Sequence, residues 1–137
     1  MSDIPRPLAD EVILRARNRC EYCRLSQLGQ EATFHIDHIT PRAAGGPTTS
    51  ENLALACVSC SLRKWAKRAA VDPLSGAEVP LFHPRADVWG EHFRWDGPLL
   101  VPLTPTGRAT AESLAFNRPM IVAIRQEETA RGRHPPG

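Results

Sequence analysis

Two short cysteine motifs decide how this chain folds: residues 20–23 read CEYC and residues 57–60 read CVSC. All four cysteines of the chain lie in these motifs. Each Cys-x-x-Cys pair forms a knuckle that provides two thiolates, and two knuckles complete the tetrahedral coordination of a structural Zn²⁺. The sequence therefore predicts a zinc site formed by Cys20, Cys23, Cys57 and Cys60. Two disulfides, or four thiols without a metal, are the alternatives.

The segment between the two motifs is predicted to form a β-hairpin. Residues 31–39, EATFHIDHI, are rich in β-formers and stop just before Pro41, as a strand would. Residues 41–51, PRAAGGPTTSE, contain two prolines and a Gly-Gly pair and predict a loop. Residues 53–55 then return toward the second motif. The cysteines thus close a hairpin that has Asp37 and His38 at the end of its first strand.

Helical patterns flank this hairpin on both sides. Residues 8–17 place apolar side chains on one face and predict a first helix. After the second motif, residues 61–70, SLRKWAKRAA, repeat apolar residues at i, i+3, i+4 and i+7, so we expect a second helix with Trp65 in the core. The opposite face of that helix would be basic. It would hold Arg63, Lys64, Lys67 and Arg68.

The second half of the chain predicts a separate accessory domain. Asp-Pro at 72–73 and Ser-Gly at 75–76 break the helical pattern, so we divide the chain into domains 1–70 and 71–137. Residues 89–95 and 99–103 predict two strands paired across Asp96-Gly97. Thr106 and Asn117 would cap two helices, over residues 108–115 and 117–131, and the tail after Gly132 is expected to be loose. The fold class is α+β.

Composition and charge are those of a globular protein. Hydrophobic residues make up 42% of the chain, charged residues 23%, and the net charge is +2. Residues 1–70 hold ten basic and seven acidic side chains, whereas residues 71–137 hold seven and eight. A nucleic-acid surface is therefore expected in the first half. With no run of about 18 apolar residues and no export signal, we expect a cytoplasmic protein that does not contact membranes.

The two cysteine motifs, the hairpin between them and the basic helix, taken in this order, resemble the HNH endonuclease family, also called the ββα-metal or His-Me finger family. The resembling stretch runs from Cys20 to about Lys67 and contains CEYC, FHIDHITPRAAGG and ENLALACVSCSLRK. The resemblance implies a zinc-held, treble-clef-like ββα-metal core, to which the second half adds a small C-terminal α/β extension. It also implies a metal-dependent hydrolase that cleaves phosphodiester bonds, with double-stranded DNA as the expected partner.

The same resemblance assigns roles to three residues. His38 would be the general base, and Asp37 would be a ligand of a catalytic Mg²⁺ or Mn²⁺. Asn52 would tie the loop backbone across the hairpin and so fix His38. The competing interpretations are a loop histidine, a turn-capping aspartate and an ordinary Asx turn.

Ser61 departs from the family pattern, which usually has His or Asn at this position as a second metal ligand. The Ser61 hydroxyl would be a poorer ligand. His35 is the alternative ligand, because strand parity puts it on the same side as Asp37, although a packed structural histidine is the competing interpretation. Phosphate contacts are expected from Arg42, Arg63, Lys64, Lys67 and Arg68.

Two other functions are compatible with the sequence. The chain could be a zinc module that binds nucleic acid but has lost catalysis through Ser61, or a zinc scaffold that binds only proteins. A basic helix face that is merely solvated would favour the second of these. Salt-sensitive binding to nucleic acid separates the two.

Overall fold

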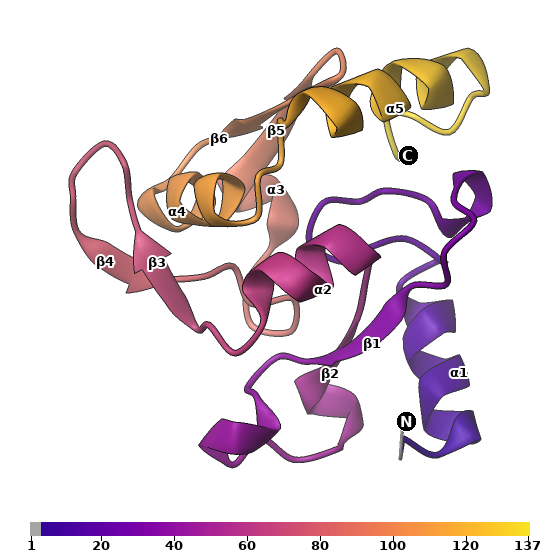
Figure 1. The fold of residues 1–137 in the computed structure, drawn as a ribbon, viewed down its shortest axis with the longest axis vertical. Coiled ribbons are helices and arrows are strands. Elements are labelled where there is room, and N and C mark those ends of the chain that lie inside the picture. The colour runs from indigo at the N-terminus through magenta and orange to yellow at the C-terminus, as the bar shows by residue number, and fades with distance from the viewer. Residues whose placement is uncertain (1–3) are drawn as a thin grey trace. The chain divides into compact units, whose positions relative to one another are not determined.

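The computed structural model describes residues 4–137, which divide after Ala66 into two compact units, each with its own elements (Figure 1). The first unit contains α1 (Arg6–Arg15), β1 (His35–His38), β2 (Leu53–Ala56) and α2 (Val58–Lys64). The second unit contains β3 (Ala69–Val71), β4 (Glu78–Pro80), α3 (Trp89–His92), β5 (Phe93–Asp96), β6 (Leu99–Pro102), α4 (Pro105–Ser113) and α5 (Pro119–Ala130). The predicted boundary after residue 70 falls inside β3. No helix among the described residues is both long enough and apolar enough to cross a membrane.

The centre of the first unit is the predicted hairpin. β1 and β2 pair antiparallel, in a register that runs from His35 opposite Ala56 to His38 opposite Leu53. All four residues of β2 are buried, and α1, whose Val12 is fully buried, packs beside this strand. The hairpin therefore presents β1, with Asp37 and His38, on the more accessible side of a small core.

The helix after the second cysteine motif is shorter than predicted. α2 ends at Lys64, Trp65 takes a left-handed conformation with φ 48° and ψ −120°, and residues 69–71 form β3. The predicted apolar face is also wrong, because Leu62 is 66% exposed and Trp65 is 79% exposed. Cys60 must point toward the other cysteines. Lys64 follows one turn later on the same face and is therefore buried.

The second unit contains a two-stranded ribbon that the sequence pattern did not reveal. β3 and β4 are three residues each and pair antiparallel. Asp72 organises the turn between them, because its carboxylate accepts hydrogen bonds from Leu74 N–H at 3.0 Å and from the Ser75 hydroxyl at 2.8 Å. Arg108 on α4 completes this arrangement with two hydrogen bonds to Asp72, of 2.8 and 2.9 Å.

The predicted hairpin of the second unit is present, with different ends and caps. β5 pairs with β6 across Gly97, whose φ is 58°, but Trp89 lies in the short helix α3 and not in the strand. α4 is capped by Thr104, whose hydroxyl accepts the Gly107 N–H at 2.9 Å, and not by Thr106. The Asn117 carboxamide bonds both backbone groups of Leu100 and does not cap α5.

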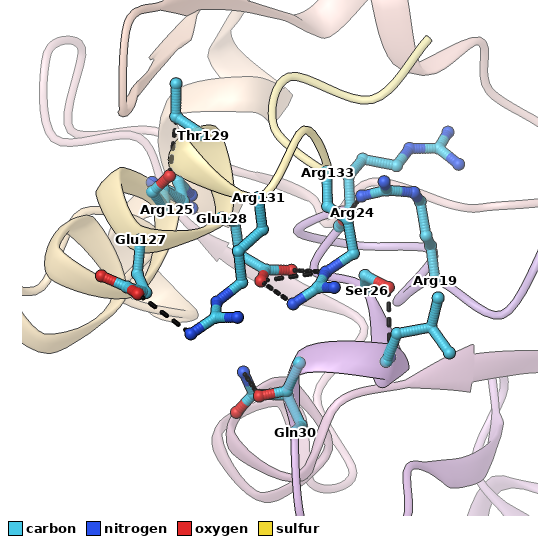
Figure 2. Close-up of polar contacts among 12 residues, drawn as sticks. Arg19, Arg24, Ser26, Gln30, Arg125, Glu127, Glu128, Thr129, Arg131 and Arg133 are labelled. Atoms are coloured by element: carbon cyan, nitrogen blue, oxygen red, sulfur yellow. Dashed lines mark hydrogen bonds and ion pairs between the residues drawn. The ribbon is translucent and has the colours of Figure 1, made fainter.

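The segment after α5 is fastened, contrary to the expected loose tail. Figure 2 shows the Arg133 guanidinium paired with Glu128 of α5, at 2.7 Å, and Arg131 paired with Glu127 at 3.3 Å. His134 is buried, and its Nε2 lies 2.8 Å from the Gly97 carbonyl oxygen in the β5–β6 turn. The chain beyond Gly132 therefore closes back onto the second unit.

Candidate active site

The four cysteine side chains converge as the sequence predicts. Their Sγ atoms all lie within 4.8 Å of one another, and all four residues are buried. The Cys23 and Cys57 sulfurs are 3.8 Å apart, which is the edge of a tetrahedron with Zn–S bonds of about 2.3 Å and far longer than a disulfide of about 2.05 Å. The thiols are free. This donor set fits a structural Zn²⁺.

The cysteine sulfurs accept hydrogen bonds from the backbone and contact one another. The N–H groups of Cys23 and Cys60 each donate to the sulfur of the first cysteine in their own motif, both at 3.4 Å. Hydrogen bonds from the Cys20, Cys23 and Cys60 thiols lower the pKa of Cys57 strongly, which favours a thiolate. The same mutual contacts raise the pKa of Cys23 and Cys60, so a metal ion must displace their protons when it binds.

Glu21 connects the first cysteine motif to β2 through two hydrogen bonds of its own. Its N–H donates to the Leu55 carbonyl at 2.8 Å, and its carboxylate accepts the Leu55 N–H at 2.9 Å. Glu21 is only 6% exposed. The first knuckle is therefore held against the strand that leads into the second one.

A pocket of about 760 Å³ lies over β1 and the start of α2. Its polar lining brings together five residues singled out in the sequence, and its apolar lining comes from six others. The polar residues are His35, Asp37, His38, Arg42 and Ser61. The apolar residues are Phe34, Ile36, Pro41, Ala43, Trp65 and Ala66.

His38 is oriented by two side chains of the loop. Its Nε2 atom lies 2.9 Å from the Thr48 hydroxyl and accepts a hydrogen bond from Arg42 Nε at 3.3 Å. A guanidinium can only donate, so Nε2 carries no proton in this arrangement, and the neutral ring has its proton on Nδ1. Nε2 is thus the basic nitrogen of His38. No feature of the sequence pattern singled out Thr48.

Asn52 makes the cross-hairpin contacts that the sequence suggested. Its side-chain oxygen accepts the Thr40 N–H at 2.8 Å, and its side-chain nitrogen donates to the carbonyls of Thr40, at 3.0 Å, and Pro47, at 2.8 Å. Gly46 makes this close approach feasible, because a Cβ there would lie 1.8 Å from the Thr40 carbonyl oxygen. The loop that follows His38 is therefore fixed at both of its ends.

Asp37 is held from below by two buried side chains. Lys64 Nζ and the Tyr22 hydroxyl both lie 3.1 Å from Asp37 Oδ2, and Lys64 Nζ also donates to the His38 carbonyl at 3.2 Å. Burial raises the pKa of the Asp37 carboxyl, although Lys64 and Tyr22 oppose that shift. Burial likewise raises the pKa of Tyr22 well above its ordinary value.

This arrangement corrects the role expected for Lys64. Its side chain is 2% exposed, so it does not lie on a phosphate-binding surface. It faces the protein interior under the candidate catalytic pair. Tyr22 was not among the predicted site residues. Its place inside the first cysteine motif was the available signal, because this motif brings the ring close to the hairpin.

The two candidates for a second metal ligand contact each other. His35 Nδ1 lies 2.9 Å from the Ser61 hydroxyl oxygen. Together with Asp37, they line the pocket with a carboxylate, a hydroxyl and an imidazole. Such a donor set fits Mg²⁺ or Mn²⁺ if water and a substrate phosphate supply further oxygens. Among the residues that the structure describes, only the four cysteines form a cluster of three or more strong ligands.

The basic residues are distributed differently from the predicted helix face. Arg42 is exposed and lines the pocket, and Arg63 is exposed on α2, where its Nε donates to Ser59 at 3.1 Å. Lys67 and Arg68 are exposed but belong to the second unit. Lys67 Nζ donates there to the Ser113 hydroxyl at 3.3 Å. Arg42 is therefore the basic side chain that the structure places directly at the pocket.

Comparisons with known proteins bear on the same segment. Residues 20–67 match the family model described as HNH endonuclease, and this stretch spans both cysteine motifs, the hairpin and α2. Neither the comparison with curated proteins nor the comparison with solved structures gave a match. Residues 20–67 are thus similar to the HNH endonuclease family, and the four cysteines within this stretch are placed to bind a metal.

Proposed function

We propose that the first unit is a metal-dependent endonuclease that hydrolyses phosphodiester bonds, with double-stranded DNA as its substrate. The family match supports an action on nucleic acid in general. The observation that carries the finer proposal is the pocket of about 760 Å³, in which the adjacent residues Asp37 and His38 both take part. Each is oriented by named partners, as a catalytic pair needs to be.

In this proposal His38 is the general base. Its Nε2 takes a proton from a water molecule, the water oxygen bonds to phosphorus, and the bond from phosphorus to the 3′ oxygen breaks. The leaving oxygen takes a proton from solvent, so the products are a 5′-phosphate and a 3′-hydroxyl. Imidazole is the side chain that exchanges protons most readily near neutral pH. Asn52 keeps the loop, and with it Thr48 and Arg42, in place around Nε2.

Asp37 would hold the catalytic divalent ion, with His35 or Ser61 as its neighbour in the pocket. Because Lys64 and Tyr22 both bond Oδ2, Oδ1 is the oxygen left to face a metal. When bound, Mg²⁺ or Mn²⁺ supplies Lewis-acid stabilisation of the charge that develops on the phosphate and the leaving oxygen. Arg42 adds a fixed positive charge at the same pocket.

A second function has its own supporting observation. Lys64 already neutralises Asp37, and position 61 provides only a hydroxyl, so metal binding at this site is weak by composition. A protein of this kind would bind nucleic acid through Arg42 and Arg63 without cutting it. The four-cysteine site would then serve only the fold.

Cleavage of supercoiled plasmid separates the two functions. The zinc-loaded protein is incubated with plasmid, with and without added Mg²⁺ or Mn²⁺, beside the variants His38→Ala and Asp37→Ala. With added metal, we expect nicked or linear product from the wild type and from the control variant, but not from His38→Ala or Asp37→Ala. Asp10→Ala is the matched control, because Asp10 lies exposed on α1 and pairs only with Arg6 among the contacts described. Wild-type protein that binds plasmid but never cuts it would support the second function.

A further inference from the structure

We infer that Trp65 is a stacking platform for an unpaired base next to the scissile phosphate. This inference rests on the proposed nuclease function and deepens it by naming the state of the strand that the pocket accepts. The ligand is a nucleic-acid strand with at least one base outside a duplex stack. A single strand and an extruded base in a duplex both provide this chemistry.

The first support is the position of the Trp65 ring. The side chain is 79% exposed, directly after the last residue of α2, and it lines the pocket that contains His38, Asp37 and Arg42. Exposed apolar side chains are common, but an indole on the rim of a candidate catalytic pocket offers a flat surface at the place where a nucleotide would lie. Core packing does not explain this residue.

The second support is the backbone of Trp65. Its φ of 48° and ψ of −120° are close to those of the first central residue in a type II′ turn, a position that glycine dominates. The Trp65 N–H closes the end of α2 by donating to the Ser61 carbonyl at 3.0 Å. Glycine would do this without strain. A strained backbone that carries an exposed ring is the pattern expected of a ligand-binding residue.

The third support is the division of the pocket into polar and apolar linings. Its polar residues suit a phosphate, whereas Phe34, Pro41 and Trp65 among its apolar residues suit a base. A volume of about 760 Å³ is within the range of pockets that hold small organic ligands and exceeds what a phosphate group alone requires. Inside a duplex both faces of a base are covered by its neighbours. The base that contacts Trp65 must therefore be unpaired.

The test compares three oligonucleotides at one salt concentration: a single strand, a perfect duplex and a duplex with one bulged base. Dissociation constants are measured by fluorescence anisotropy for wild type, Trp65→Gly and Trp65→Phe, with Leu62→Ala as the control. Leu62 is 66% exposed on α2 but does not line the pocket. We expect Trp65→Gly to weaken binding of the single strand, the bulged duplex or both by about 10-fold, as for loss of one stacked base, and to leave the perfect duplex within about twofold.

Two further readouts separate stacking from a structural role. Trp65→Phe keeps an aromatic face and should retain most of the affinity. Trp65→Gly relieves the strained backbone and should unfold at the same or a higher temperature than wild type. Loss of single-strand but not bulged-duplex affinity would identify a single strand as the source of the base, and the reverse would identify an extruded base.

Equal weakening on the perfect duplex, or no weakening on any oligonucleotide, would overturn the inference. Plasmid cleavage by the same proteins keeps this result distinct from the proposed function. Wild type that cuts plasmid while Trp65→Gly binds all three oligonucleotides normally refutes only the stacking platform. If wild type never cuts plasmid but Trp65→Gly binds the single strand more weakly than wild type, only the nuclease proposal is refuted.

Discussion

Asn52 carries three hydrogen bonds with one carboxamide, and this makes it a sensitive test of the loop. Asn52→Ala would leave the Thr40 N–H and the carbonyls of Thr40 and Pro47 without their partner. We expect the free energy of unfolding to fall by about 2–4 kcal/mol, from three lost bonds in a residue that is 8% exposed. Urea unfolding measures this loss.

The activity of Asn52→Ala should fall more than its affinity for DNA. The substitution frees the loop that orients His38, whereas Arg42 and Arg63, the proposed phosphate contacts, are unchanged. Asn52→Asp is the informative comparison, because it keeps an acceptor for Thr40 N–H but places an anion against two carbonyl oxygens. An Asn52→Ala protein as stable and as active as wild type would show that the loop is held in place without this amide.

Position 61 determines how strongly the pocket holds a catalytic ion, if the proposed nuclease is correct. Ser61→His replaces a neutral hydroxyl with a stronger ligand, so the midpoint of a Mn²⁺ titration of cleavage should move to lower concentration. Because His35 Nδ1 contacts Ser61, the variant His35→Ala must be titrated in parallel. An unchanged midpoint in Ser61→His, together with loss of activity in His35→Ala, would assign the second ligand to His35.

Single residues were predictable where their chemistry dictates their environment. Four thiols with knuckle spacing have few other uses, and the Asn52 amide followed from the family pattern. Lys64 was predicted to be exposed and Trp65 to be buried, and the structure shows the reverse. The prediction was wrong because it took the apolar side chains as the buried face of the helix. In the structure the rotation of α2 follows Cys60, whose thiol points toward the other cysteines. A buried lysine under a carboxylate has no sequence signal of its own.

At the level of elements, the hairpin and its cysteines should behave as one folding unit. Cys57→Ser removes one of four ligands from a cluster whose sulfurs lie within 4.8 Å of one another. We expect loss of zinc and of protection from hydrogen exchange at the amides of β2, since metal binding and folding are coupled in such sites. Metal analysis and exchange measurements test both. Ser59→Ala, within the same motif, should retain the metal and the protection.

Short elements were the hardest to predict. β3 and β4 have three residues each, too few for an alternating pattern, and the turn between them depends on Asp72 bonding Arg108 far along the chain. Thr104, not Thr106, caps α4, because Pro105 begins the helix and its missing N–H costs nothing at that position. The pairing of β1 with β2 and of β5 with β6, bounded by Gly and Pro, was predicted, but the predicted first strands were too long, and Trp89 lies in α3.

On the scale of the whole molecule, the second unit should have an acid-sensitive ion pair of its own. Hydrogen bonds from Arg108 lower the pKa of Asp72 below its ordinary value of 3.8. A lowered folded-state pKa gives stability that is present above the unfolded-state pKa and is lost as pH falls through the folded-state pKa. We therefore expect the stability of this unit to fall progressively as the pH drops below about 4. Fluorescence of Trp89 and Trp95, in a Trp65→Phe background, follows it.

The substitution Asp72→Asn tests this assignment. The variant should be less stable than wild type at neutral pH and should lose less stability on acidification, because the titrating pair is absent. Asp96→Asn, at an exposed position at the end of β5, is the control and should keep the wild-type pH dependence. Parallel pH curves for wild type and Asp72→Asn would show that another group governs acid unfolding.

The link between Glu21 and Leu55 has a consequence for how fast the protein handles its metal. Two hydrogen bonds keep the first knuckle against β2, and β2 runs straight into the second knuckle. The sulfur pairs therefore need not find each other by diffusion of a 33-residue loop each time an ion arrives. The link should therefore speed the first capture of zinc, although loss of zinc should still loosen β2, because metal binding and folding are coupled in such sites.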